Sequence, residues 1–481
     1  MTIKLYDTLS RTVKELKPLD GKKYRFYCCG PTVYGPAHIG NFRTFLVQDV
    51  FRRVLGLEGE QEGWAPYYVR NLTDVDDKTI RGSQAQKVSL TEFTEKWTKK
   101  FHEDCEALNM IKPDEEPTAT GHIPEQIEMI QTLIDKGHAY VAKDGSVYYK
   151  VNTFKYYGKL AHLDQSHLQT QSENSAGNAN LADEYDRESV ADFSLWKAHK
   201  DEDGPNAWDS PWGKGRPGWH IECSAMSKKY LGETFDLHAG GIDLCFPHHE
   251  NEIAQSEGAS GKPFAMHWFH SAHLQVEGAK MSKSLGNLYT LDDIRNKGHN
   301  PMVARYLLIS GHYRHPLNFT MDGLSAATSA LNKLEKFARF LLEKANLDEA
   351  SFEVFAKDVQ YADWASFESA WKELCDDLNI PSALGEVFKT IKELENKELS
   401  AIEAKKELKG FSKIMYALGL KLFTEVKKEA PKEIYELAKK RWEAKNSKDF
   451  ANADRLRVEI ETKGWKILDH KEGFELEVLK K

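Results

Sequence analysis

His248 and Glu252 are spaced like two ligands of one metal ion. Pro247 precedes them, and proline is common at the first position of a helix. Residues four apart lie on one helix face, so the sequence predicts an imidazole beside a carboxylate, half of a tetrahedral metal site. His249 would share a face with Glu252 as well. Spacing alone therefore leaves open which histidine is the ligand.

Two of the six cysteines, Cys29 and Cys223, lie in motif-rich segments and could complete this site. Two thiolates, an imidazole and a carboxylate suit Zn²⁺ by softness and geometry. Cys28 and Cys29 are adjacent on a predicted strand, so their side chains should point to opposite faces and only one should reach the metal. Cys245 is interpreted as a packing residue, although it is the nearest rival ligand. A purely structural zinc is the alternative, but structural sites more often have closely spaced cysteines.

The turn around His38 has the composition of a phosphate site. Small residues at Gly35, Ala37 and Gly40 would let a phosphate chain approach the start of the next helix. Free backbone N–H groups there favour anions. His38 could donate a hydrogen bond to a phosphate oxygen. The alternative is a surface turn with a solvated histidine.

The segment from Lys280 to Ser284 reads Lys-Met-Ser-Lys-Ser and lies between Gly278 and Gly286. Two lysines and two hydroxyl groups in a glycine-hinged loop suit a mobile phosphate clamp. Lys283 could stabilise charge on an α-phosphate and on departing pyrophosphate. A lysine pair in a loop is by itself usually only solvated.

These two motifs together resemble the signatures of class I aminoacyl-tRNA synthetases. The first signature, of His-Ile-Gly-His type, falls at His38 to Asn41, and the second at Lys280 to Ser284. Asn41 stands where the family usually has histidine; it can donate a hydrogen bond but carries no charge. The resemblance implies catalytic roles for four residues: His38, Asn41, Lys280 and Lys283.

Four further segments resemble the cysteinyl-tRNA synthetase family in particular. They are Cys29 to Tyr34, Asn71 to Lys78, Gly218 to Met226 and Phe246 to Glu252. The resemblance covers most of the first 320 residues and continues more weakly at Asp377 to Pro381 and Lys448 to Asp454.

The resemblance also implies the roles of single residues. The family's zinc ligands fall at Cys29, Cys223, His248 and Glu252, which favours His248 over His249. ATP would be bound by His38, Gly40, Gly241, Asp243 and Lys283, with Asp243 on the ribose hydroxyls or, alternatively, serving as a helix cap.

The resemblance places the amino-acid pocket at Gly30, Thr73 and Trp219. A plain core role is the alternative for Trp219. His238 would lie near the amino acid or the adenosine, or else be a core histidine.

The family's reaction has two steps and implies L-cysteine, ATP with Mg²⁺, and tRNA-Cys as partners. Cysteine would attack the α-phosphate of ATP to give cysteinyl-adenylate, and the cysteinyl group would then move to the terminal ribose of the tRNA. One zinc ion per chain would select a thiolate over the hydroxyl of serine, so no editing domain is required. A monomer is expected.

The fold expected to position these residues is an α/β, doubly wound parallel-sheet (Rossmann-like) catalytic domain. Apolar strand patterns occur at residues 24–30, 67–72, 231–243 and 266–275, with a helical pattern at 42–55. The first half of this domain is expected at 1–112 and the second half, with the lysine motif, at 218–310. A connective insertion is expected at 113–217, and its polar residues 162–189 predict a surface excursion or a disordered loop.

Leucine-rich helical patterns dominate the rest of the chain. We expect a stem-contact linker at 311–345, a helical-bundle anticodon-binding domain at 346–430, and a small α+β tRNA-binding tail at 431–481. The whole chain has a formal charge of −8, whereas residues 421–481 hold 16 Lys and Arg against 13 Asp and Glu. The tail is therefore mildly basic.

Targeting patterns are lacking in this sequence. No signal peptide is recognised at the start, and no apolar run approaches the ~18 residues that span a membrane. A cytoplasmic protein with reduced cysteines is expected.

Two other functions share parts of the pattern. A cysteine ligase of small-thiol biosynthesis would use the same catalytic domain on an amino sugar, but it lacks a long tail, and this chain continues for about 160 residues past the catalytic region. A catalytically dead RNA-binding relative is the second, and the intact lysine motif with a full ligand set argues against it.

Overall fold

The chain forms two compact units in a computed structural model, Met1–Leu422 and Phe423–Lys481, and each is described by itself. The structure describes residues 1–163, 192–281, 285–358, 363–423, 430–447, 449–470 and 473–478. Lys283 and nearly all of the polar stretch 162–189 lie outside these ranges. Among the described residues, no helix combines the length and the apolarity needed to cross a membrane.

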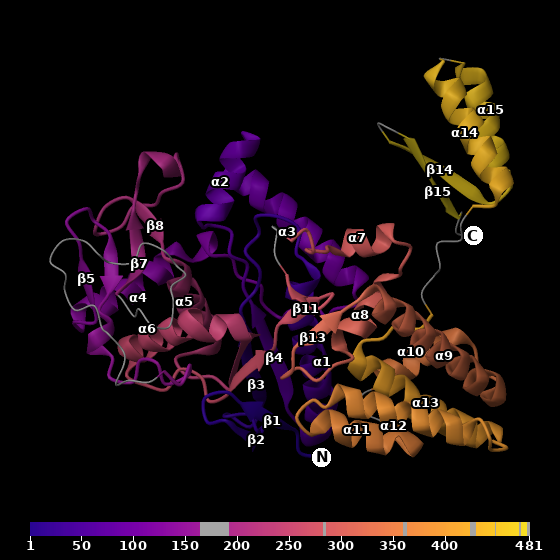
Figure 1. Cartoon of the computed structure of the whole chain (residues 1–481), viewed down its shortest axis with the longest axis horizontal. Helices are drawn as coiled ribbons and strands as arrows, with labels where there is room; N and C mark the ends of the chain where they lie inside the picture. Colours follow the sequence, from indigo (N-terminus) through magenta and orange to yellow (C-terminus); the bar gives the residue numbers. More distant parts are fainter. Residues whose placement is uncertain are drawn as a thin grey trace. The chain divides into compact units, whose positions relative to one another are not determined.

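A four-stranded parallel sheet is the centre of the first unit (Figure 1). Its strands are β3 (Lys23–Cys28), β4 (Ala65–Arg70), β9 (Leu237–Gly241) and β10 (Trp268–Ser271), in the order β10-β9-β3-β4. Because the strand order reverses at β3, a crevice is expected at the carboxyl ends of β3 and β9, where open α/β sheets bind their ligands. The predicted parallel-sheet α/β class is confirmed.

Helix α1 (Ile39–Glu62) connects β3 to β4 and begins at the His38 turn. His38 is its N-cap, and Asn41 completes a capping box by bonding back to the cap. At the other end Gly63 adopts the left-handed conformation (φ 80°) that glycine tolerates best. Helices α2 (Asp77–Gln86) and α3 (Leu90–Ala107) follow β4.

The insertion carries its own antiparallel sheet, in the order β5-β6-β7-β8. Its elements are η1 (Thr120–His122), α4 (Ile123–Asp135), β5 (Ala139–Val141), β6 (Val147–Tyr149), η2 (Val151–Thr153), β7 (Phe193–Ala198), η3 (Asp201–Asp203) and β8 (Gly215–Pro217). Helix α5 (Trp219–Leu231) then leads back to β9, packed against α4 and α6.

The segment after β9 differs from the single regular helix predicted from Pro247. A 3-10 turn, η4 (Ile242–Leu244), leads into a kinked segment, η5 (Cys245–His249), in which Phe246 is extended (φ −141°). The regular helix α6 (Glu250–Ser260) begins only after these turns. Local backbone irregularity of this kind is frequent at functional sites.

The rest of the first unit is a three-stranded sheet, a terminal hairpin and helices. The small sheet has β11 (Leu274–Val276), β12 (Ala279–Lys280) and β13 (Leu317–Phe319); the hairpin has β1 (Lys4–Asp7) and β2 (Thr12–Glu15). The helices are α7 (Leu291–Asn296), α8 (Pro301–Ile309), α9 (Met321–Ala345), α10 (Glu349–Lys357), η6 (Ala365–Phe367), α11 (Glu368–Cys375), α12 (Ile380–Leu394) and α13 (Ala401–Leu418).

A buried ion cluster joins the helical part to the sheet domain. Asp49 on α1 accepts hydrogen bonds from Arg53 (2.8 Å) and Arg305 (2.6 Å). Burial alone would raise the pKa of Asp49, but the two guanidinium groups outweigh it and hold that pKa below its usual value. Arg305 also donates to the carbonyl of Leu418, the last residue of α13, at 2.9 Å.

The second unit is a small α+β body. Helices α14 (Lys432–Asn446) and α15 (Phe450–Thr462) pack on an antiparallel hairpin of β14 (Trp465–His470) and β15 (Gly473–Val478). Its core is formed by Ile434, Ala438, Ile460, Trp465 and Ile467.

Candidate active site and metal centre

Four buried side chains from three parts of the fold meet beyond the carboxyl ends of β3 and β9. Their ligand atoms, from Cys29, Cys223, His248 and Glu252, all lie within 4.8 Å of one another. Cys29 Sγ is 3.8 Å from Cys223 Sγ and 3.6 Å from Glu252 Oε1. His248 Nε2 is 3.1 Å from the same carboxylate oxygen.

These separations suit a single tetrahedral ion. Metal–ligand bonds of about 2.0 to 2.3 Å place neighbouring ligand atoms about 3.3 to 3.8 Å apart. The donor set also suits a borderline-soft cation, because two sulfurs are combined with one nitrogen and one oxygen. The residues therefore fit a metal ion, and the irregular η5 turn still presents His248 and Glu252 on one side.

A second set of ligand atoms shares two members with the first. Cys29, His238, His249 and Glu252 also lie within 4.8 Å of one another. His238 Nε2 is 2.8 Å from Glu252 Oε2, and His249 Nε2 is 3.4 Å from Cys29 Sγ. His249 thus stays an alternative to His248. His238, expected beside the amino acid, the adenosine or in the core, lies against the metal cluster.

Burial controls protonation throughout this cluster. It lowers the pKa of His248 to about 3 and lowers that of His249, so both imidazoles are neutral and able to ligate. Burial raises the pKa of the Cys29 and Cys223 thiols. Binding of a metal must therefore release thiol protons.

A layer of polar contacts behind the ligands orients the rings. His248 Nδ1 is 2.8 Å from His220 Nδ1, and His249 Nδ1 is 2.7 Å from His270 Nε2. His270 Nδ1 in turn lies 2.8 Å from Thr8 Oγ1. Contacts of this kind fix which ring nitrogen faces a metal.

The other two cysteines near the cluster point elsewhere. Among the described residues, neither candidate ligand set includes Cys28 or Cys245. Cys28 is buried near Arg70 and Tyr68, and burial raises its pKa. Cys245 packs in the apolar core with its sulfur 3.9 Å from the carbonyl of Leu160.

Of the three residues predicted for the amino-acid pocket, Trp219 contacts a candidate ligand, and Gly30 and Thr73 contact segments next to candidate ligands. Trp219 begins α5, and its ring centroid is 4.2 Å from that of His248. Gly30 follows the ligand Cys29, and a Cβ added there would lie 1.7 Å from the backbone oxygen of Asn71. Thr73, just beyond β4, donates a 2.8 Å hydrogen bond to Glu222.

The helix cap at the histidine turn uses one ring nitrogen of His38. The backbone N–H of Asn41 donates to His38 Nδ1 at 3.2 Å, so Nδ1 is an acceptor and the proton of the neutral ring sits on Nε2. Burial lowers the pKa of His38, with Asp243 opposing it, which keeps the ring neutral near pH 7. His38 is half-buried and caps a helix, so it is not the solvated surface histidine of the alternative interpretation.

The structure brings the two phosphate motifs together. A Cβ added to Gly40 would lie 3.1 Å from Met281 Sδ of the lysine motif. The backbone N–H of Ile39 donates to the carbonyl of Tyr289, downstream of that motif, at 2.9 Å. Lys280 ends β12 and is exposed.

The two residues predicted to hold adenosine lie at the end of β9. Gly241 is the last residue of that strand and the N-cap of η4. A Cβ added to Gly241 would lie 2.3 Å from Asp243 Oδ1, so glycine lets the carboxylate approach the strand end. The N-cap residues of η4, η5 and α6 are Gly241, Leu244 and His249, so Asp243 is the cap of none of them.

Several supporting residues were missed from the sequence: Asn71, His220, Glu222 and His270. Asn71, His220 and Glu222 lie inside the motifs quoted above, where a polar residue at a strand end or in the first turn of a helix was the available signal. His270 had no signal of this kind.

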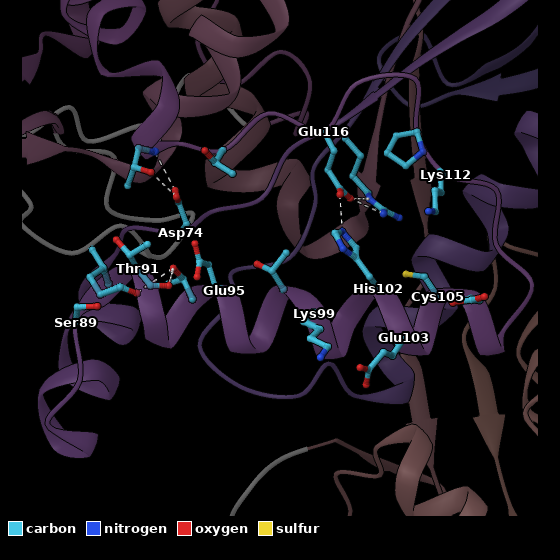
Figure 2. A pocket seen from close by; sticks show the side chains of 18 of the residues that line it. Asp74, Ser89, Thr91, Glu95, Lys99, His102, Glu103, Cys105, Lys112 and Glu116 are labelled. Carbon is cyan, nitrogen blue, oxygen red and sulfur yellow. Dashed lines mark hydrogen bonds and ion pairs between the residues drawn. The ribbon is translucent and has the colours of Figure 1, made fainter.

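The cavity in Figure 2 is a separate space of about 1200 Å³ between α3 and residues 109–120. Some of its polar groups pair with one another: Arg70 Nη2 donates to Glu116 at 2.6 Å, and Thr120 N donates to Asp74 at 2.9 Å. None of the site residues predicted from sequence lines it.

A family model confirms what this fold and site indicate. The model described as tRNA synthetases class I (C) catalytic domain matches residues 15–329, so the chain is a class I tRNA synthetase by family. The cysteine--tRNA ligase of Opitutus terrae is 53% identical over 100% of both chains. That of Protochlamydia amoebophila is 43% identical over 98% of this chain and 97% of its own. The chain belongs to the cysteine--tRNA ligase family.

Solved structures show the same fold at low sequence identity. A Mycobacterium tuberculosis methionyl-tRNA synthetase in complex with methionyl-adenylate has a TM-score of 0.57 and 14% identity over 82% of this chain and 90% of that one. A putative arginyl-tRNA synthetase from Campylobacter jejuni has a TM-score of 0.53 and 12% identity over 83% and 92%.

Proposed function

We propose that this chain activates L-cysteine with ATP and transfers it to the terminal ribose of tRNA-Cys. Cysteine would attack the α-phosphate to give cysteinyl-adenylate and pyrophosphate, and a ribose hydroxyl of the tRNA would then take the cysteinyl group and release AMP. The observation that carries this proposal is the buried Cys29, Cys223, His248 and Glu252 group inside a class I synthetase site.

Cys29, Cys223, His248 and Glu252 would hold one Zn²⁺. Cysteine and serine differ by a single atom, and a plain pocket separates such near-isosteres poorly. When bound, zinc supplies a Lewis acid that favours a thiolate over a hydroxyl group. Gly30, Thr73 and Trp219 would form the walls that orient the rest of the amino acid.

The phosphate chemistry would depend on positioning and charge. His38 can donate from Nε2 to a phosphate oxygen because Nδ1 is already committed to the cap. Asn41 supports that cap, and Lys280 and Lys283 would stabilise charge on the α-phosphate and on departing pyrophosphate, together with Mg²⁺ on ATP. No covalent enzyme intermediate is required.

ATP would lie over the carboxyl ends of the sheet. Gly40 and Gly241 leave room for close approach, and Asp243 would accept hydrogen bonds from the ribose hydroxyls. The catalytic domain would then consist of residues 1–112 and 218–310, interrupted by the insertion 113–217.

The remaining regions would bind tRNA. We assign stem contact to 311–345, anticodon binding to the helices in 346–430, and further tRNA contact to 431–481, whose described part is the α+β unit. A cytoplasmic monomer would suffice for this reaction.

Cysteine-dependent exchange of pyrophosphate into ATP tests the first step. We expect exchange with L-cysteine and at most a trace with L-serine; no exchange by zinc-loaded protein would overturn the proposal. Charging of a tRNA-Cys transcript tests the second step. Transfer to an amino sugar instead of the tRNA would identify a small-molecule ligase.

A further inference from the structure

A buried chain of hydrogen bonds runs from the end of β3 to the first turn of α5. The backbone N–H of Gly30 donates to Asn71 Oδ1 at 2.9 Å, and Asn71 Nδ2 donates to Thr73 Oγ1 at 3.3 Å. Thr73 Oγ1 donates to Glu222 Oε2 at 2.8 Å. Asn71 and Thr73 are 1% exposed and Glu222 is 0% exposed, so water does not compete for these contacts.

The direction of these bonds is set by the two ends of the chain. Gly30 offers only an N–H, so the amide of Asn71 must turn its oxygen toward Gly30 and its nitrogen toward Thr73. At the other end, the Thr73 hydroxyl gives its proton to Glu222 Oε2. The Thr73 oxygen is then left with one lone pair and no proton for a further partner.

The position of Thr73 is fixed as firmly as its hydrogen bonds. Its backbone N–H donates to the carbonyl of Pro31, and its carbonyl accepts from the N–H of Val33, both at 3.1 Å. Glu222 immediately precedes the candidate ligand Cys223 on α5. The hydroxyl is therefore held in a fixed position, and the contacts above leave one of its lone pairs unused.

Among the groups of an amino acid, an acceptor of this kind selects the ammonium. With sulfur at the metal cluster and the carboxylate directed to ATP, the ammonium is the remaining donor of bound cysteine. Its positive charge also suits a neighbourhood that holds the carboxylates of Glu222 and Glu252.

We propose that Glu222 is a positioning residue that makes Thr73 an acceptor for the substrate's α-ammonium group and adds a favourable charge behind it. This inference rests on the proposed function, since it assumes that cysteine is the amino acid bound. It assigns to Glu222 the recognition of the amino group, separately from recognition of the sulfur by the metal cluster.

The test compares two ligands that differ only in the amino group. L-Cysteine is measured by its KM in pyrophosphate exchange, and 3-mercaptopropionate, which keeps the thiol and carboxylate but has no amine, by its Ki as a competitor. We expect Glu222→Gln and Thr73→Val each to raise the KM for cysteine about tenfold, the effect of one lost charge-assisted hydrogen bond. The Ki of 3-mercaptopropionate should change by less than about twofold in either variant.

The double variant should be little worse than either single one, because both remove the same interaction. Glu125→Gln is the matched control. Glu125 lies on α4 near the surface and pairs at 2.5 Å with Lys229 of α5, the helix that also carries Glu222. It removes the same charge and should leave both constants unchanged. Bound zinc, measured directly, should stay at one ion per chain in all variants.

Three outcomes would overturn the inference. They are a parallel rise of the KM for cysteine and the Ki of 3-mercaptopropionate, an unchanged KM in Thr73→Val, and loss of zinc from Glu222→Gln with both ligands weakened together. Absence of cysteine-dependent exchange in the wild-type protein is a separate result, which would overturn the proposed function and the inference with it.

Discussion

The end of the site that we assign to the amino acid is closed, whereas the end that we assign to ATP is open. Cys29, Cys223, His248 and Glu252 are between 0% and 5% exposed. His38 and Asn41 are only half-buried, and Lys280 is exposed. Under the proposed function, selection of the amino acid would depend on groups whose positions the fold has already fixed, and phosphate chemistry would depend on groups that water still reaches.

This difference predicts two kinds of effect for substitutions in the site. A change at the closed end should alter which ligand binds, because the preformed group has no freedom to compensate. A change at the open end should alter the rate after binding, because its lysines act mainly on charge that develops during the reaction.

Replacement of a candidate ligand should have the largest effect. Cys223→Ser should lower bound zinc and reduce kcat/KM for cysteine by more than about 100-fold, exceeding the loss usually caused by changing a group behind a metal ligand. The KM for ATP should barely change. Bound zinc is measured directly, and pyrophosphate exchange gives the kinetic constants. Equal effects on the KM for cysteine and the KM for ATP would indicate a structural metal.

The control for this prediction is Cys245→Ala. Its sulfur is buried but belongs to neither candidate ligand set among the described residues. Zinc should stay bound, and a loss of zinc would make Cys245 a ligand.

At the open end, Lys280→Ala should lower kcat for pyrophosphate exchange about 100-fold, the usual loss when one group that stabilises developing charge is removed. The KM for cysteine should stay within about twofold, because the closed end is intact. Lys262→Ala, which removes an exposed lysine paired with Glu233, is the control. A rise in the KM for cysteine in place of a fall in kcat would contradict the division between binding at the closed end and rate at the open end.

Rigidity of the closed end can be tested at Gly30. Gly30→Ala should lower the free energy of unfolding by about 2 kcal/mol, because the added methyl group would meet the backbone of Asn71, which cannot move as a side chain can. Gly56→Ala in α1 meets nothing within 4 Å and should raise stability by about 0.5 to 1 kcal/mol. Denaturant unfolding measures both, and a neutral Gly30→Ala would mean that this strand end can relax.

The smallest effect should be a pH dependence at His38. Burial lowers its pKa in the folded protein, so the unfolded chain binds more protons as the pH falls through the usual histidine value. Wild-type stability should therefore fall relative to His38→Asn between about pH 7.5 and about pH 5.5. Asparagine can still cap the helix but does not titrate. Parallel unfolding curves for both proteins would contradict the lowered pKa.

Much of the site could be predicted because its chemistry lies in short motifs. The pairing of His248 with Glu252 is kept despite the kink in η5, since the two side chains still contact one another. The choice between His248 and His249 could not be made from spacing, and the structure explains why: each has a ring nitrogen near the cluster.

What could not be predicted depends on contacts distant in the chain. The pairing of Thr73 with Glu222 joins residues 149 positions apart, and the contact of His270 with Thr8 spans 262. Neither leaves a local pattern. The parallel sheet followed from apolar strand patterns separated by helices, whereas the short hairpin of β1 and β2 has too few residues for such a pattern.

The buried cluster of Asp49, Arg53 and Arg305 limits how the chain can be shortened. Arg305 and Arg53 donate to the carbonyls of Leu418 and Tyr416, at the end of α13. A fragment that stops before α13 would keep both guanidinium groups but lose these acceptors. Guanidinium N–H groups would then lack hydrogen-bond partners, which is costly for buried donors. The smallest self-sufficient catalytic fragment should therefore extend to about residue 420, far beyond the last catalytic motif.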